Sequence, residues 1–137
     1  MEMVTREYAK YFNNKYNSAG HVFQGRFKSF TVQDKEFYFA CSRYIDMFPV
    51  VNNKVKEPKE YEWSGYNALA FGQKGNVNLD SHELYTNLGT SDAERQLVYR
   101  TLVLQKFGPD LDLENRKAGI LGSKEFKKAV KIGRAHV

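Results

Sequence analysis

The chain has 137 residues, 15% of them aromatic, and a formal net charge of +5. This composition is sufficient for a core of one domain, or one and a half, and excludes disorder as a global state, while the charge favours a polyanion such as nucleic acid as partner. The single cysteine, Cys41, excludes an internal disulfide, and without any long apolar run we expect no membrane span and a reducing, cytoplasmic setting.

The first predicted elements are a helix and a strand. Apolar residues recur every three or four positions over residues 2–16, which predicts a helix that ends before Gly20. Residues 21–32 alternate in polarity, which predicts a strand with Phe23 and Phe27 facing a core. Its polar face is either an ordinary solvated face or a surface for a phosphate backbone. That face carries Gln24, Arg26 and Lys28.

A second helix is predicted over residues 35–47, with Asp34 as its N-cap and Pro49 ending it. One face of this helix is predicted to be apolar. That face carries Phe37, Cys41, Tyr44 and Phe48. Residues 50–62 form a polar connector. A short aromatic group follows and is predicted to cover the core. It consists of Trp63, Tyr66, Leu69 and Phe71.

The remaining residues predict short helices at 81–88, 91–107 and 123–131, the last of them capped by Ser123. Ser91 and Glu94 have the spacing of a capping box. An apolar side is expected on the middle helix, along Leu97, Val98, Thr101, Leu102 and Leu104. The last helix has lysines on one side, which is either a solvated face or a phosphate-contacting surface. These include Lys124, Lys127 and Lys128. The string from Ile132 to Val137 matches one reading frame of a common sequencing adapter, so we leave it out of functional reasoning.

Four segments, in this order and spacing, resemble one family. They are Tyr11–Asn13 with Gly20–Ser29 (GHVFQGRFKS), Arg43–Val50 (RYIDMFPV), Tyr61–Tyr66 (YEWSGY) and Gly119–Phe126 (GILGSKEF). Together they are similar to the REP-associated tyrosine transposases, which are relatives of the insertion-sequence-200 transposases. The resemblance extends over nearly the whole chain as far as Lys131.

Membership would imply a ferredoxin-like domain that works as a homodimer on single-stranded or hairpin DNA. In such enzymes a tyrosine attacks a DNA phosphodiester and forms a 5′-phosphotyrosine link, and Mg²⁺ or Mn²⁺ is held by a His-hydrophobic-His motif. Tyr44 occupies the position of that tyrosine. The resemblance and the charge pattern together predict a set of DNA contacts. This set is His21, Gln24, Arg26, Lys28, Arg43, Lys124, Lys127 and Lys128.

Two departures from the family pattern argue against cleavage by this chain alone. No His-hydrophobic-His pair is present, and Phe48 stands where the family commonly has Asn one turn after the tyrosine. We therefore expect no metal ligands here and read the chain as the C-terminal part of a longer protein. The alternatives are a non-catalytic DNA-binding remnant and a helical interaction domain with a chance resemblance.

The expected fold class is α+β, with a partial ferredoxin-like domain followed by a small helical module. Residues 1–72 would belong to the transposase domain, residues 73–131 to the helical module, and residues 132–137 to the adapter string.

Overall fold

The computed structural model describes residues 2–75, 79–106, 108–111 and 119–134. The chain combines helices with two short strands, so the α+β class is confirmed. In chain order the elements are α1 (Glu2–Tyr16), β1 (Phe30–Val32), α2 (Lys35–Val51), the 3₁₀ helix η1 (Pro58–Glu60), α3 (Tyr66–Phe71), α4 (Glu83–Thr86), α5 (Asp92–Leu104), β2 (Gly119–Leu121) and α6 (Lys124–Arg134).

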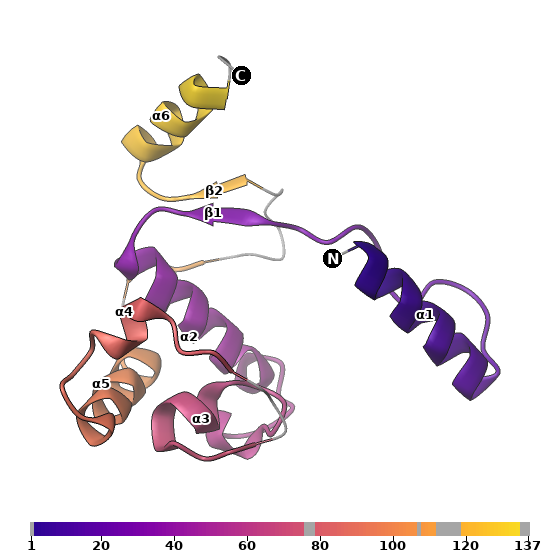
Figure 1. Cartoon of the computed structure of the whole chain (residues 1–137), viewed down its shortest axis with the longest axis horizontal. Coiled ribbons are helices and arrows are strands. Elements are labelled where there is room, and N and C mark those ends of the chain that lie inside the picture. Colours follow the sequence, from indigo (N-terminus) through magenta and orange to yellow (C-terminus); the bar gives the residue numbers. More distant parts are fainter. Residues whose placement is uncertain (1, 76–78, 107, 112–118, 135–137) are drawn as a thin grey trace.

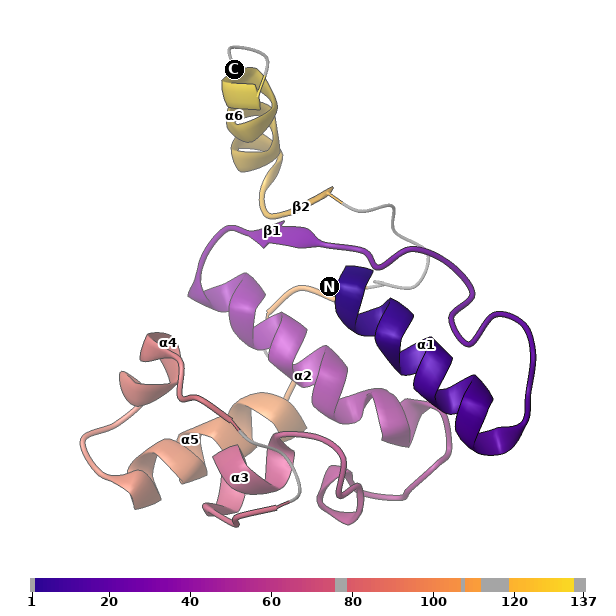
Figure 2. The same cartoon turned by 45° about the vertical axis from the view of Figure 1, so that its right-hand side comes forward.

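The core lies where α5 packs against both α2 and α3, with α4 closing one side (Figure 2). Burial of apolar side chains from all these helices stabilises the fold. The most buried of them are Phe39, Tyr66, Ala70, Tyr85, Tyr99 and Val103. The core therefore combines residues on both sides of position 72, where the sequence predicts a division between two units.

A buried hydrogen bond to a carboxylate links α2 and α5 inside this core. Asp46 of α2 is only 3% exposed and its Oδ2 accepts a hydrogen bond from the Tyr99 hydroxyl at 2.7 Å. Burial raises the pKa of Asp46 to about 6, and the hydrogen bond from Tyr99 opposes that rise. Burial likewise raises the pKa of Tyr99, so this hydroxyl stays protonated and keeps donating.

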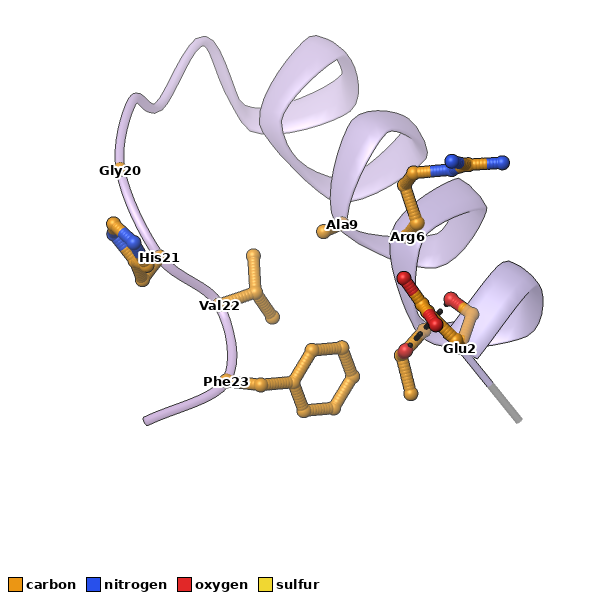
Figure 3. A pocket seen from close by; sticks show the side chains of 8 residues that line it. Glu2, Arg6, Ala9, Gly20, His21, Val22 and Phe23 are labelled. Atoms are coloured by element: carbon orange, nitrogen blue, oxygen red, sulfur yellow. Dashed lines mark hydrogen bonds between the residues drawn. The ribbon is translucent and has the colours of Figure 1, made fainter. Parts of the chain in front are cut away.

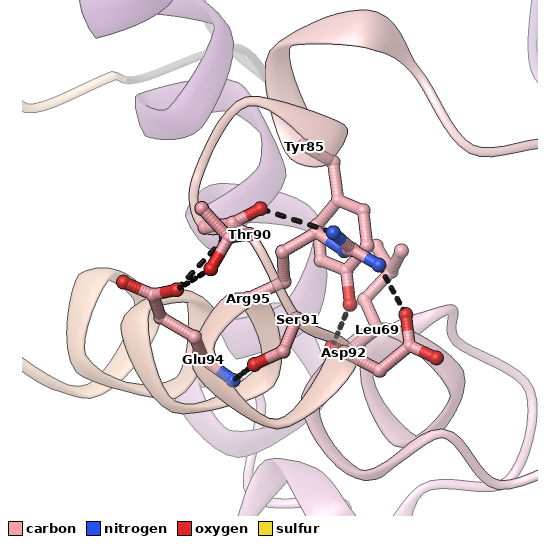
Figure 4. A network of polar contacts seen from close by, with 8 residues as sticks. Leu69, Tyr85, Thr90, Ser91, Asp92, Glu94 and Arg95 are labelled. Atoms are coloured by element: carbon pink, nitrogen blue, oxygen red, sulfur yellow. Dashed lines mark hydrogen bonds and ion pairs between the residues drawn. The ribbon is translucent and has the colours of Figure 1, made fainter.

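The junction between α4 and α5 is fixed by polar contacts (Figure 4). Ser91 Oγ accepts from the Glu94 amide at 3.3 Å, which confirms Ser91 as the N-cap. The Glu94 carboxylate accepts from the amide of Thr90 at 2.8 Å, so the return bond of the predicted capping box reaches one residue earlier. The Tyr85 hydroxyl donates to the carbonyl of Leu69 at 2.7 Å and ties α4 to α3.

The two strands form a parallel pair that joins distant parts of the chain (Figure 1). Phe30 pairs with Gly119 and Val32 with Leu121, which is 1% exposed. Just beyond the pair, the Gln33 side chain accepts from the Ser123 amide at 2.6 Å. Ser123 Oγ accepts from the Phe126 amide at 3.1 Å, so the predicted cap of the last helix is confirmed.

The predicted strand over residues 21–32 is wrong for most of its length, because only Phe30–Val32 is strand. A strand is held by its neighbour, and β2 is three residues long, so it can pair with no more than this short stretch. The two predicted faces are therefore not formed. Phe23 and Phe27 are 42% and 54% exposed, on the same irregular segment as Arg26.

The second helix also differs from its prediction. It continues through Pro49 to Val51, since a proline so close to the helix end removes a single backbone donor. The helix stops where Asn53 adopts a left-handed φ of 54°. Its buried face is Phe39, Ala40, Asp46 and Pro49 instead of the predicted one. Tyr44 is half-buried, and Phe48 is 40% exposed.

Two further predictions of packing are confirmed only in part. Leu102 of the predicted apolar side of α5 packs against the core, but the buried side chains of this helix are Tyr99 and Val103. Leu97 and Leu104 are each 57% exposed, because α2 and α3 lie against the other side of α5. In the aromatic group, Tyr66 is buried and Leu69 packs on the core, whereas Trp63 is 62% exposed.

The helix predicted over residues 2–16 is confirmed as α1, but none of its residues is buried. This helix lies apart from the α2–α3–α5 core in Figure 1. Its Tyr8 ring lies next to the ring of Phe23, with 6.1 Å between the ring centroids. The final helix runs on to Arg134, and residues 135–137 of the adapter-like string lie outside the described part. Within the described ranges, no helix is long and apolar enough to cross a membrane.

Candidate nucleic-acid interface

Tyr44 borders a small cavity between α2 and the residues that follow α5. The cavity has a volume of ≈ 50 Å³ and brings Arg43 and Tyr44 together with Lys106. Space for a single water requires about 10–15 Å³, so a small anion fits better than an organic ligand. The remaining lining residues are Ala40, Gly108, Pro109, Asp110 and Leu111.

Cationic side chains outnumber carboxylates among the described residues that line this cavity. Lys106 Nζ pairs with Asp110 Oδ2 at 2.5 Å, whereas Arg43 Nε is buried without a hydrogen-bond acceptor among the described residues. Among the described residues that line this cavity, two cations therefore stand against one carboxylate. Positive charge beside the tyrosine attracts an approaching phosphate.

The residues of the described part do not fit the divalent metal of the family. They contain no group of three or more His, Cys, Asp or Glu that could hold an ion. His82 Nδ1 accepts from the Leu84 amide at 3.1 Å as the cap of α4, and its ring stacks on Tyr38. Phe48, one turn after Tyr44, offers a ring 5.8 Å from the tyrosine ring and no ligand atom.

His21 lies at a separate hollow against α1 (Figure 3). This hollow, of ≈ 450 Å³, lies between the first turns of α1 and residues 20–23. Val22 and Phe23 point toward the helix, while the His21 ring points away from it. The hollow that His21 lines shares no residue with the cavity at Tyr44, so the structure does not bring these two residues into one site.

The other predicted DNA contacts lie at the two ends of the short sheet. Gln24, Arg26 and Lys28 are exposed on the segment that leads into β1. Lys124 and Lys128 are exposed on α6, directly after β2, and Lys127 is half-buried there. Because β1 and β2 are parallel, the first group stands at the start of both strands and the second at their end.

Sequence reasoning missed Lys106 and the Asp46–Tyr99 pair. Lys106 follows α5 and reaches Tyr44 only through the packing of α5 on α2, for which the sequence carries no local signal. For Asp46 the sequence does carry a local signal. A carboxylate between Ile45 and Met47 on a core-facing helix needs a buried hydrogen-bond partner.

No protein-family model matches the chain, and searches of curated proteins and of solved structures find no significant match.

Proposed function

We propose that this chain is the single-stranded-DNA-binding part of a tyrosine transposase of the REP-associated kind, acting in the cytoplasm. The observation that carries the proposal is the placement of basic side chains at both ends of the two-stranded sheet. Arg26 and Lys28 precede β1, and Lys124 and Lys128 follow β2. A polyanion lying along the sheet would meet cations at both of its ends.

The motif resemblance supports the same proposal and adds a chemistry. In the family reaction a tyrosine oxygen bonds to phosphorus, the bond from phosphorus to the 3′ oxygen breaks, and that oxygen leaves as a hydroxyl after taking up a proton. Tyr44 would be the attacking residue, with Arg43 and Lys106 beside it to attract the phosphate. The short sheet would then be part of a ferredoxin-like sheet in a protein that pairs with a second copy.

No group of three or more His, Cys, Asp or Glu in the described part of the chain could hold the metal that the family reaction uses, so we route no step through a metal and propose binding without cleavage. Phe48 supports this, because a phenyl ring cannot replace a carboxamide as ligand. The cations around Tyr44 remain suited to holding DNA, since attraction of a phosphate needs no deprotonated tyrosine.

Replacing Arg26 and Lys28 together with Ala tests the binding surface. Both side chains are exposed, so the variant should stay folded. We expect weaker binding to every single-stranded sequence and a salt dependence reduced in slope by about 1.4, which corresponds to two lost phosphate contacts at about 0.7 each. Fluorescence anisotropy of a labelled hairpin at several salt concentrations measures both quantities.

Lys10 and Lys15 of α1 provide the matched control, as two exposed cations away from the sheet. Their joint replacement by Ala removes the same charge and should change the salt slope less. Equal slopes for the two double variants would show that net charge, and not this surface, accounts for binding.

A further inference from the structure

Another cavity opens at the end of α2. It has a volume of ≈ 430 Å³ and is lined by Phe48, Pro49, Asn52, Lys54 and Tyr61. We call it the Phe48 cavity. Its volume falls within the range of about 300–1,000 Å³ that is usual for small-ligand sites. Its lining combines two aromatic rings, one amide and one cation, without an acidic side chain.

Phe48 contributes little to the core, because 40% of its surface is exposed. Its ring lies 5.8 Å from the ring of Tyr44, so the two form a continuous aromatic edge along α2. An aromatic side chain that is held at the surface beside a cavity is a platform on which a flat ring can stack. Phe48 stands where the resembled family commonly has Asn. It offers no ligand atom beside Tyr44 but does offer a ring for stacking.

Backbone contacts fix the helix side of the Phe48 cavity. Asn52 Nδ2 donates to the Phe48 carbonyl at 2.9 Å, and the Lys54 amide donates to the Pro49 carbonyl at 2.8 Å. Asn53 takes the left-handed conformation that turns the chain between them. Lys54 is therefore placed by the helix end and not by a flexible loop.

Backbone contacts also fix the other side of the Phe48 cavity, where Tyr61 lies. Tyr61 directly follows η1, and its amide donates to the Pro58 carbonyl at 3.2 Å. The Glu60 carboxylate accepts from the amide of Lys56 at 2.8 Å, which closes the cap of η1. Because η1 packs on α2, Tyr61 is held in place across from Phe48 before any ligand arrives.

We propose that the Phe48 cavity receives one unpaired base of single-stranded DNA. The proposal rests on the proposed function and adds the place where a base is held. The base stacks on Phe48 or Tyr61, the Lys54 ammonium meets a neighbouring phosphate, and the Asn52 carboxamide oxygen accepts from the edge of the base. An adjoining hollow of ≈ 730 Å³ shares Lys54 and is lined also by Lys56 and Glu60, so two lysines stand against one carboxylate there. This hollow would continue the path of the DNA strand.

The test compares two oligonucleotides of equal length, one of thymidine and one abasic, which carry the same phosphates with and without bases. Phe48→Leu keeps an apolar side chain and removes the stacking ring. We expect it to weaken binding of the thymidine strand about tenfold, as for one lost base–aromatic contact, and to leave the abasic strand unaffected. Tyr61→Leu is the second variant, and circular dichroism verifies that both are folded.

Trp63→Leu is the matched control, because Trp63 is 62% exposed and does not line the Phe48 cavity. It should leave both affinities as in the wild type. If Phe48→Leu and Tyr61→Leu bind the thymidine strand as tightly as the wild type, the base site is refuted and DNA binding stands. If the wild type binds neither strand at low salt, the proposed function fails. Saturable, Phe48-dependent binding of thymidine monophosphate would then still support the cavity.

Discussion

Replacing Asp46 with Asn should change the stability of the protein relative to the wild type by about 2–3 kcal/mol between pH 4 and pH 7. The carboxyl of Asp46 is buried, and its pKa rises from 3.8 to about 6 in the folded protein. Such a difference corresponds to about 3 kcal/mol, since each pKa unit is worth about 1.4 kcal/mol. Asn has a similar shape and no titration in this range.

The direction in which stability changes with pH depends on whether the folded or the unfolded state binds the proton of Asp46 more tightly. Between pH 3.8 and about 6 the folded protein keeps the proton on Asp46, whereas the unfolded chain has released it. Stability contributed by this group is therefore largest below pH 4, falls as the pH rises to about 6, and stays low above that value. The free energy of unfolding of the wild type should decline relative to Asp46→Asn across this window.

Urea unfolding at several pH values measures the difference between the two proteins. Tyr99→Phe is the control, since it removes the hydroxyl that donates to the Asp46 carboxylate at 2.7 Å. Without that donor the pKa of Asp46 should rise further, and the decline should move to higher pH. Parallel stability curves for wild type and Asp46→Asn would contradict a raised pKa.

Replacing Tyr66 with Ala should lower the free energy of unfolding by about 3–5 kcal/mol, the usual cost of removing a large buried ring. Tyr66 is 2% exposed, and its ring lies edge-on to Phe71 at 5.9 Å and 6.5 Å from that of Tyr99. It belongs to α3, and Tyr99 belongs to α5, so the loss should destabilise both predicted units together.

Trp63→Ala is the matched control, because this larger ring is 62% exposed and should cost less than about 0.5 kcal/mol. Thermal unfolding followed by circular dichroism and by amide exchange in α3 and α5 compares the two variants. Two separate transitions, with only that of residues 1–72 affected by Tyr66→Ala, would show that the shared core is not cooperative.

The elements predicted well are those set by local interactions. The helix over residues 2–16 follows from its own spacing of apolar residues. The caps Asp34, Ser91 and Ser123 each accept from a backbone amide two or three residues ahead. Such short-range hydrogen bonds can be read from sequence because both partners lie within one turn.

The predictions that failed depend on contacts between distant residues. The partner of Phe30 in the sheet is Gly119, so nothing near residues 21–29 could show that the strand is short. The buried side of α5 depends on α2 and α3, whose packing selects Tyr99 over Leu97. The candidate site shows the same division: Arg43 and Tyr44 are neighbours in sequence, whereas Lys106 joins them through the tertiary fold.

We propose that this chain binds single-stranded DNA through its basic surfaces and does not cleave it. The most direct measurement incubates the chain with a labelled single-stranded hairpin and Mg²⁺ or Mn²⁺, and divides each sample between anisotropy and a denaturing gel. We predict saturable anisotropy at low salt and no protein–DNA adduct on the gel. A covalent adduct that Tyr44→Phe abolishes would contradict the claim, and so would an unchanged anisotropy at low salt.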